Sequence, residues 1–146
     1  LVSNIASGTS AQIEGFIRFP GFIAKVCNLA ITDSTDVQKE AYFVLCNAIR
    51  TANLDQARHL VDLGVLNTLS EGLKKDDSKI LMIILEGLKH ALYIDTKQPD
   101  QGPYMGQFES LGLIEQIEKL QNHNSDDVYR AAVKCLEYFE TEEQSQ

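Results

Sequence analysis

A glycine-containing turn followed by two apolar helical segments occurs three times in this chain, and no other feature constrains its fold as strongly. The turn glycines stand at positions 21, 64 and 112, which are 43 and then 48 residues apart. A helical repeat of this length predicts a stack of units in which each unit packs only on its neighbours. The turns read Phe19-Pro20-Gly21-Phe22-Ile23, Asp62-Leu63-Gly64-Val65-Leu66 and Ser110-Leu111-Gly112-Leu113-Ile114.

Apolar residues with a helical period place a short, a middle and a long helix in each unit, and no strand-like alternation appears. Armadillo and HEAT units both have periods of about 40–47 residues. Three helices per unit favour the armadillo architecture, so we predict an all-α, right-handed armadillo solenoid. The helices are expected at about 9–18, 22–29 and 37–49, at 54–63, 65–73 and 80–93, and at 104–111, 113–122 and 128–139.

We interpret residues 1–146 as one solenoid fragment of about three repeats that begins inside a helix of a preceding repeat. The chain ends in an acidic, polar segment, and the last helix is expected to fray after about Phe139. The expected boundaries are 1–8 for the end of the preceding repeat, 9–51, 52–94 and 95–140 for the repeats, and 141–146 for the acidic tail.

The charge balance indicates which partners the chain can attract. The formal net charge is −8 and the sequence pI is about 4.8. Nucleic acids and anionic membranes bind basic surfaces, so we expect neither as a partner. A basic peptide fits this charge, although a merely solvated acidic surface would give the same balance. Cys27, Cys46 and Cys135 form no C-x-x-C pair, which favours a reducing compartment and a core role for each.

Sequence signals for catalysis or cofactor binding are weak. His59, His90 and His123 occur one per repeat and lack the spacings of a metal site. The segment from Gly72 to Ser78 contains two lysines but not the order of a phosphate-binding loop. No nucleophile motif is visible. We therefore expect a binding protein without a cofactor rather than an enzyme.

Short stretches along the whole chain, in the right order, resemble the C-terminal armadillo repeats of the importin-α (karyopherin-α) family of nuclear import adapters. Each stretch is weak alone, but the ordered set is specific. The stretches are 3–6 (SNIA), 38–48 (QKEAYFVLCNA), 60–64 (LVDLG), 77–80 (DSKI), 86–88 (EGL), 117–123 (IEKLQNH), 128–131 (VYRA) and 138–143 (YFETEE).

The resemblance implies a concave groove lined by the third helix of each repeat, where Trp and Asn side chains four residues apart hold an extended basic peptide. Glu40, Phe43 and Asn47 share one helix face because they stand at i, i+3 and i+7. Asn47 matches the groove Asn, Phe43 replaces the Trp, and Glu40 is the expected partner of a Lys or Arg. Asn4 matches the groove Asn of the preceding repeat. The corresponding pairs in the later repeats are Glu86/His90 and Lys134/Tyr138, where the Trp–Asn pattern stops.

The resemblance also implies partners and a location. It predicts basic localisation-signal peptides of cargo proteins as ligands in part of the minor signal site. It further predicts importin-β, bound through a segment absent here, and an export receptor with Ran·GTP and a basket nucleoporin on the region from about Leu73 to Phe139. The chain would then shuttle between cytoplasm and nucleus. An armadillo scaffold of a β-catenin-like class, with a different peptide partner, is the alternative.

Overall fold

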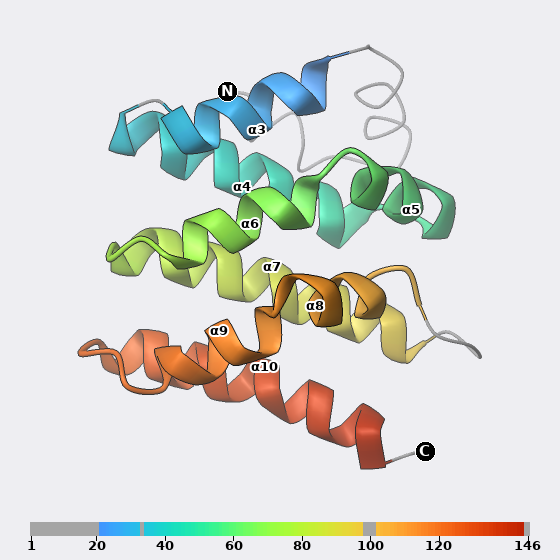
Figure 1. Ribbon diagram of the computed structural model, residues 1–146, viewed down its shortest axis with the longest axis vertical. Coiled ribbons are helices and arrows are strands. Elements are labelled where there is room, and N and C mark those ends of the chain that lie inside the picture. Colours follow the sequence, from blue (N-terminus) through green and yellow to red (C-terminus); the bar gives the residue numbers. More distant parts are fainter. Residues whose placement is uncertain (1–20, 33, 98–101, 145–146) are drawn as a thin grey trace.

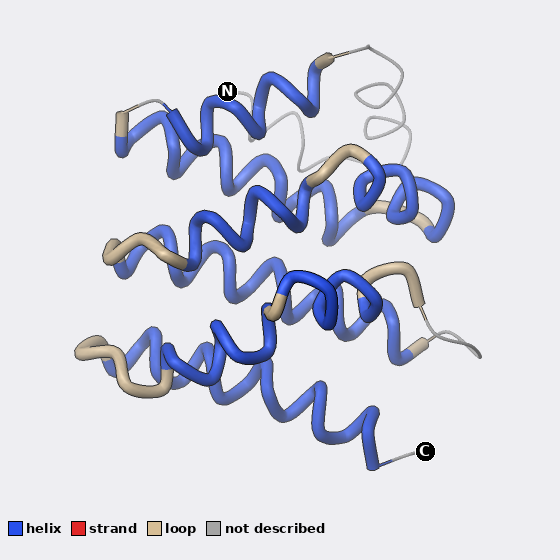
Figure 2. Tube along the Cα trace, viewed as in Figure 1, coloured by secondary structure: helices blue, strands red, loops and turns tan. Residues whose placement is uncertain are grey.

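The computed structural model describes residues 21–32, 34–97 and 102–144, and every regular element within them is a helix (Figure 2). The predicted all-α class is therefore confirmed. The expected helix over 9–18 and the segment 1–8, with Asn4, lie outside the described residues. The helices are α3 (Phe22–Thr32), α4 (Thr35–Thr51), α5 (Leu54–Asp62), α6 (Val65–Leu73), α7 (Ser78–Thr96), α8 (Met105–Leu111), α9 (Leu113–Leu120) and α10 (Asp126–Gln144).

The helices form two stacked rows along the long axis of the molecule (Figure 1). The long helices α4, α7 and α10 pack side by side in one row, and α3, α6 and α9 cover them in the other. The short helices α5 and α8 lead from one long helix to the next middle helix. This arrangement is that of a solenoid, and it places one face of α4, α7 and α10 along a continuous surface.

Three helices continue at least three residues beyond the ends expected from the sequence, and the first of them, α3, ends at Thr32 rather than near Leu29. α7 continues to Thr96 rather than ending near Tyr93. α10 continues to Gln144, five residues beyond Phe139, and the fraying expected there stays a prediction. The residues after Phe139 are Glu, Thr, Glu, Glu and Gln, among which Glu and Gln favour helix and no proline or glycine interrupts them.

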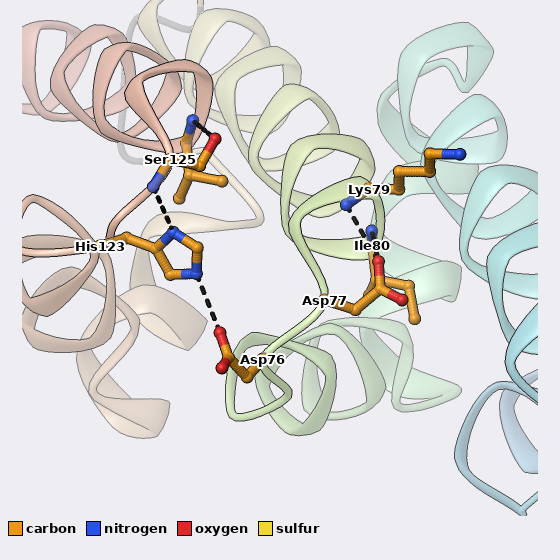
Figure 3. Close-up of polar contacts among 7 residues, drawn as sticks. Asp76, Asp77, Lys79, Ile80, His123 and Ser125 are labelled. Atoms are coloured by element: carbon orange, nitrogen blue, oxygen red, sulfur yellow. Dashed lines mark hydrogen bonds and ion pairs between the residues drawn. The ribbon is translucent and has the colours of Figure 1, made fainter.

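The predicted turn residues adopt the backbone conformations that their chemistry allows. Gly21, Gly64 and Gly112 have φ values of 85°, 87° and 67°, in the left-handed region that favours glycine. Asp77 caps α7, because its Oδ1 accepts the backbone N–H groups of Lys79 at 3.0 Å and Ile80 at 3.1 Å (Figure 3). The Asp77 cap fixes where α7 begins.

Two glycines let neighbouring helices approach closely. A Cβ added to Gly87 of α7 would lie 2.4 Å from Sγ of Cys46 on α4. A Cβ added to Gly72 of α6 would lie 2.3 Å from Cδ1 of Ile84 and 2.7 Å from the ring of Tyr42. The missing side chains therefore allow α4, α6 and α7 to pack at the distances observed.

Polar contacts hold successive helices and turns of the stack to one another. His123, in the turn after α9, contacts Asp76, in the turn before α7, so that neighbouring repeats are joined at their turns (Figure 3). The buried carboxylate of Asp95, near the end of α7, accepts the backbone N–H of Met105 at 2.7 Å and that of Tyr104 at 3.4 Å. Asp95 thereby holds the start of α8 against the end of α7.

Candidate functional site

A hollow of about 480 Å³ lies between the exposed faces of α4 and α7. Its walls come from side chains that recur every three or four residues along each helix, which puts them on one face. The lining residues are Phe43, Cys46, Asn47 and Arg50 of α4 and Met82, Ile83, Glu86, Gly87 and His90 of α7. A segment that filled this hollow would lie across both helices.

The structure brings together two of the four residues singled out from the sequence. Phe43 and Asn47 line the hollow, while Glu40 is exposed on α4 and does not line it. Asn4 lies outside the described residues. Glu86 and His90, at the positions corresponding to Phe43 and Asn47, form the facing wall on α7.

The apolar part of the hollow is contributed by both helices. Phe43 is 45% exposed, which is unusual for a large aromatic side chain and leaves part of its ring available to a ligand. Met82 and Ile83 are half-buried and pack against the core from the α7 side. Gly87 and Cys46 meet at a close approach of the two helices. This surface suits the hydrocarbon stem of a long side chain.

Asn47 supplies an unused hydrogen-bond donor. Its side-chain Oδ1 accepts a hydrogen bond from Nη2 of Arg50 at 3.1 Å. Asn47 is only 7% exposed, and its Nδ2 is buried without a hydrogen-bond partner among the described residues. A buried donor without a partner is costly and rare in folded proteins. A ligand in the hollow that brought a carbonyl oxygen to Nδ2 would remove this cost.

The charged groups of the hollow are of both signs. Glu86 forms an ion pair with Nζ of Lys89 at 3.1 Å, and its other carboxylate oxygen lies 3.4 Å from Nε2 of His90. Arg50 forms no ion pair with any described carboxylate. The sequence reasoning missed Arg50, although it continues the series of Glu40, Phe43 and Asn47 by one more helical step.

The thiol at the base of the hollow is not a reactive group. Burial raises the pKa of Cys46 from 9.0 to about 12, and the charge of Glu86 adds to that shift, although a backbone hydrogen bond at Gly87 opposes it. The thiol is therefore protonated at neutral pH. Within the described part of the chain, no three His, Cys, Asp or Glu side chains converge as a metal site. What the hollow offers a ligand is hydrogen bonding, charge and apolar surface.

The same face continues from α7 to α10 with aromatic side chains. The rings of Tyr93 and Tyr138 meet edge to face, with their centroids 6.2 Å apart. Nζ of Lys97 lies 4.9 Å from the centroid of the Tyr93 ring. This contact already occupies Tyr93 with a cation of the chain itself.

None of the described helices is long and apolar enough to cross a membrane.

Comparison with known proteins agrees with this geometry. A family model described as an atypical Arm repeat matches residues 102–146. Importin subunit alpha-5 of Arabidopsis thaliana is 30% identical over 120 residues, which cover 80% of this chain and 23% of that protein. Importin subunit alpha-4 of the same plant is 29% identical over 151 residues, which cover 99% of this chain and 28% of that protein. By these comparisons, the repeats of this chain are armadillo repeats of the importin-α type.

Solved armadillo structures extend the likeness to three dimensions. A designed armadillo repeat protein in complex with the peptide (KR)4 is 27% identical and superposes with a TM-score of 0.80, covering 94% of this chain and 54% of that one. The expected armadillo solenoid and the expected resemblance to importin-α are both confirmed. The chain spans about a quarter of the length of the curated relatives described above.

Proposed function

We propose that this chain is part of a nuclear import adapter and that the hollow between α4 and α7 helps to bind localisation-signal peptides of cargo proteins. The observation that carries this proposal is the buried, unpartnered Nδ2 of Asn47, which lines the hollow. An extended peptide has a free carbonyl at every residue and can satisfy this donor. The likeness to importin-α subunits and to an armadillo protein in complex with (KR)4 supports the same role.

In this proposal the side chains around Asn47 contact the side chains of the peptide, while Asn47 binds the peptide backbone. Phe43 provides a wall for the stem of a Lys or Arg, because its partly exposed ring is apolar and the π face of such a ring attracts a cation. Glu40, one turn before Phe43, pairs with the basic head. Asn4 would hold the peptide backbone at the preceding repeat.

The remaining partners follow from the importin-α likeness alone. They are importin-β, bound through a segment absent here, and an export receptor with Ran·GTP and a basket nucleoporin bound on the region of about 73–139. Shuttling between cytoplasm and nucleus belongs to the same proposal. The curated relatives favour this adapter over a β-catenin-like scaffold.

A titration of the 146-residue chain with a fluorescent bipartite localisation peptide tests the proposal. Binding is expected to weaken roughly fivefold in Asn47→Ala, because the peptide loses one hydrogen bond to a desolvated amide. Asn67→Ala is the matched control, since Asn67 is exposed on α6 and outside the hollow. Circular dichroism establishes that both variants are folded. Absence of binding at low salt, or equal binding by both variants, would contradict the proposed role of Asn47.

A further inference from the structure

Arg50 changes what the hollow can recognise. Its guanidinium donates to Oδ1 of Asn47 at 3.1 Å and so uses one of the two lone pairs of that oxygen. Nδ2 of Asn47 has no partner among the described residues and can only donate. Arg50 itself has five N–H donors and no acceptor. The α4 side of the hollow thus presents donors beside one another, and these fit oxygen atoms of a ligand.

The acidic wall on α7 does not cancel this preference. Both carboxylate oxygens of Glu86 are engaged on its own helix, one by the ammonium of Lys89 at 3.1 Å and the other by Nε2 of His90 at 3.4 Å. Arg50, in contrast, has no carboxylate partner among the described residues. The dipole of α4 also stabilises the positive charge of Arg50 near the C-terminal end of the helix. That effect needs no ligand and does not change which peptide the hollow prefers.

The geometry of α4 places opposite charges on the two sides of Asn47. Glu40 and Phe43 precede Asn47 on the exposed face, and Arg50 follows it by one turn. A peptide that crosses α4 at Asn47 has Phe43 on one side and Arg50 on the other. Successive side chains of an extended peptide point in opposite directions. Neighbouring residues of the peptide therefore face Phe43, with Glu40 one turn beyond it, on one side and the Arg50 guanidinium on the other.

We infer that this hollow selects a peptide in which a basic residue is followed or preceded directly by Asp or Glu, with the acidic side chain seated against Arg50. A guanidinium and a carboxylate form two parallel hydrogen bonds with good geometry, which makes Arg suited to this contact. The inference rests on the proposed peptide-binding function and specifies the ligand for the same site.

The test compares short fluorescein-labelled peptides in which Lys alternates with Glu, with Gln or with a second Lys. The measured quantity is the ratio of the dissociation constants of the Lys–Gln and Lys–Glu peptides. We expect the Lys–Glu peptide to bind roughly fivefold more tightly, since the ion pair is partly exposed to solvent. Arg50→Gln is expected to bring the ratio to about one, and Arg50→Glu to make the all-Lys peptide the tightest ligand.

Arg58→Gln is the matched control, because Arg58 is exposed on α5, where it pairs with Asp55, and lies outside the hollow. It removes the same net charge and should leave the ratio unchanged. If the ratio is the same in wild type and Arg50→Gln while Asn47→Ala still weakens every peptide, the acidic preference is wrong and the proposed function stands. If no peptide binds at low salt, both are wrong.

Discussion

Nε2 of His123 lies 3.0 Å from Oδ1 of Asp76, and the two residues are 47 positions apart in the sequence. The other ring nitrogen, Nδ1, accepts the backbone N–H of Ser125 at 3.0 Å (Figure 3). Because Nδ1 is an acceptor here, the neutral tautomer with its proton on Nε2 satisfies both contacts. His123 therefore organises the start of α10 and joins it to the turn before α7.

Replacing His123 with Ala is expected to lower the free energy of unfolding by about 1 kcal/mol, since both contacts are lost. Asp76 is 94% exposed on its side chain, so its share of this effect is small. Urea unfolding of His123→Ala, Asp76→Ala and the double variant measures that share as the coupling between the residues. A His123→Ala variant as stable as the wild type would show that the turns hold each other without this imidazole.

Gly87→Ala is expected to destabilise the fold by about 1–3 kcal/mol, because the added methyl group overlaps Cys46 and forces α4 and α7 apart. Gly106→Ala is the matched control, since nothing lies within 4 Å of the Cβ position at Gly106 on α8. That change should be neutral or stabilise by about 0.5–1 kcal/mol through helix propensity. Thermal unfolding of both variants separates the two effects, and equal melting temperatures would contradict the close approach at Gly87.

Asp95→Asn is expected to cost about 2 kcal/mol of stability, because one carboxylate oxygen that accepts a backbone N–H becomes an amide donor. The loss should be concentrated at the start of α8, where Tyr104 and Met105 provide the two N–H groups. Hydrogen exchange of these amides measures it directly, with Asp55→Asn on the exposed face of α5 as the control. Unchanged exchange at Met105 in Asp95→Asn would exclude this role for the carboxylate.

Buried thiols and a buried phenol predict a loss of stability at alkaline pH. Burial is the main cause that raises the pKa of Cys46 and of Cys135 from 9.0 to about 12, and that of Tyr42 from 10.0 to about 12. The unfolded chain releases these protons first, so stability is full below about pH 9 and falls as pH rises toward about 12. Urea unfolding across this range measures the fall, which should be smaller in Cys46→Ala/Cys135→Ala. Stability that rises with pH there would contradict the assignment.

The sequence predicts the helices well because local chemistry decides them. Asp77 caps α7 and Gly64 and Gly112 end turns through interactions within a few residues, so their patterns are readable in one dimension. The contact of Asp95 with Met105 is different. It depends on how the start of α8 packs against the end of α7. A single Asp near a helix end does not show in the sequence that this packing occurs.

The site is predictable in part for the same reason. Periodicity puts Phe43 and Asn47 on one face of α4, and the structure places both in the hollow. Periodicity alone does not show that Arg50 turns back to Asn47, because that depends on the side-chain conformation of Arg50. Gly87 also lines the hollow, and its close approach to Cys46 is a contact between two repeats, which periodicity within one helix does not show.

The hydrogen bonds from Tyr104 and Met105 to Asp95 have a consequence for how a stack of such repeats can change in length. The third turn glycine follows the second by 48 residues, five more than the preceding interval, and the chain between Thr96 and Met105 connects α7 to α8. Asp95 fixes the helices on both sides of this loop to each other. We therefore expect α8 to keep its contact with α7 when residues are inserted into this connection, which makes the connection a suitable place to graft a foreign segment.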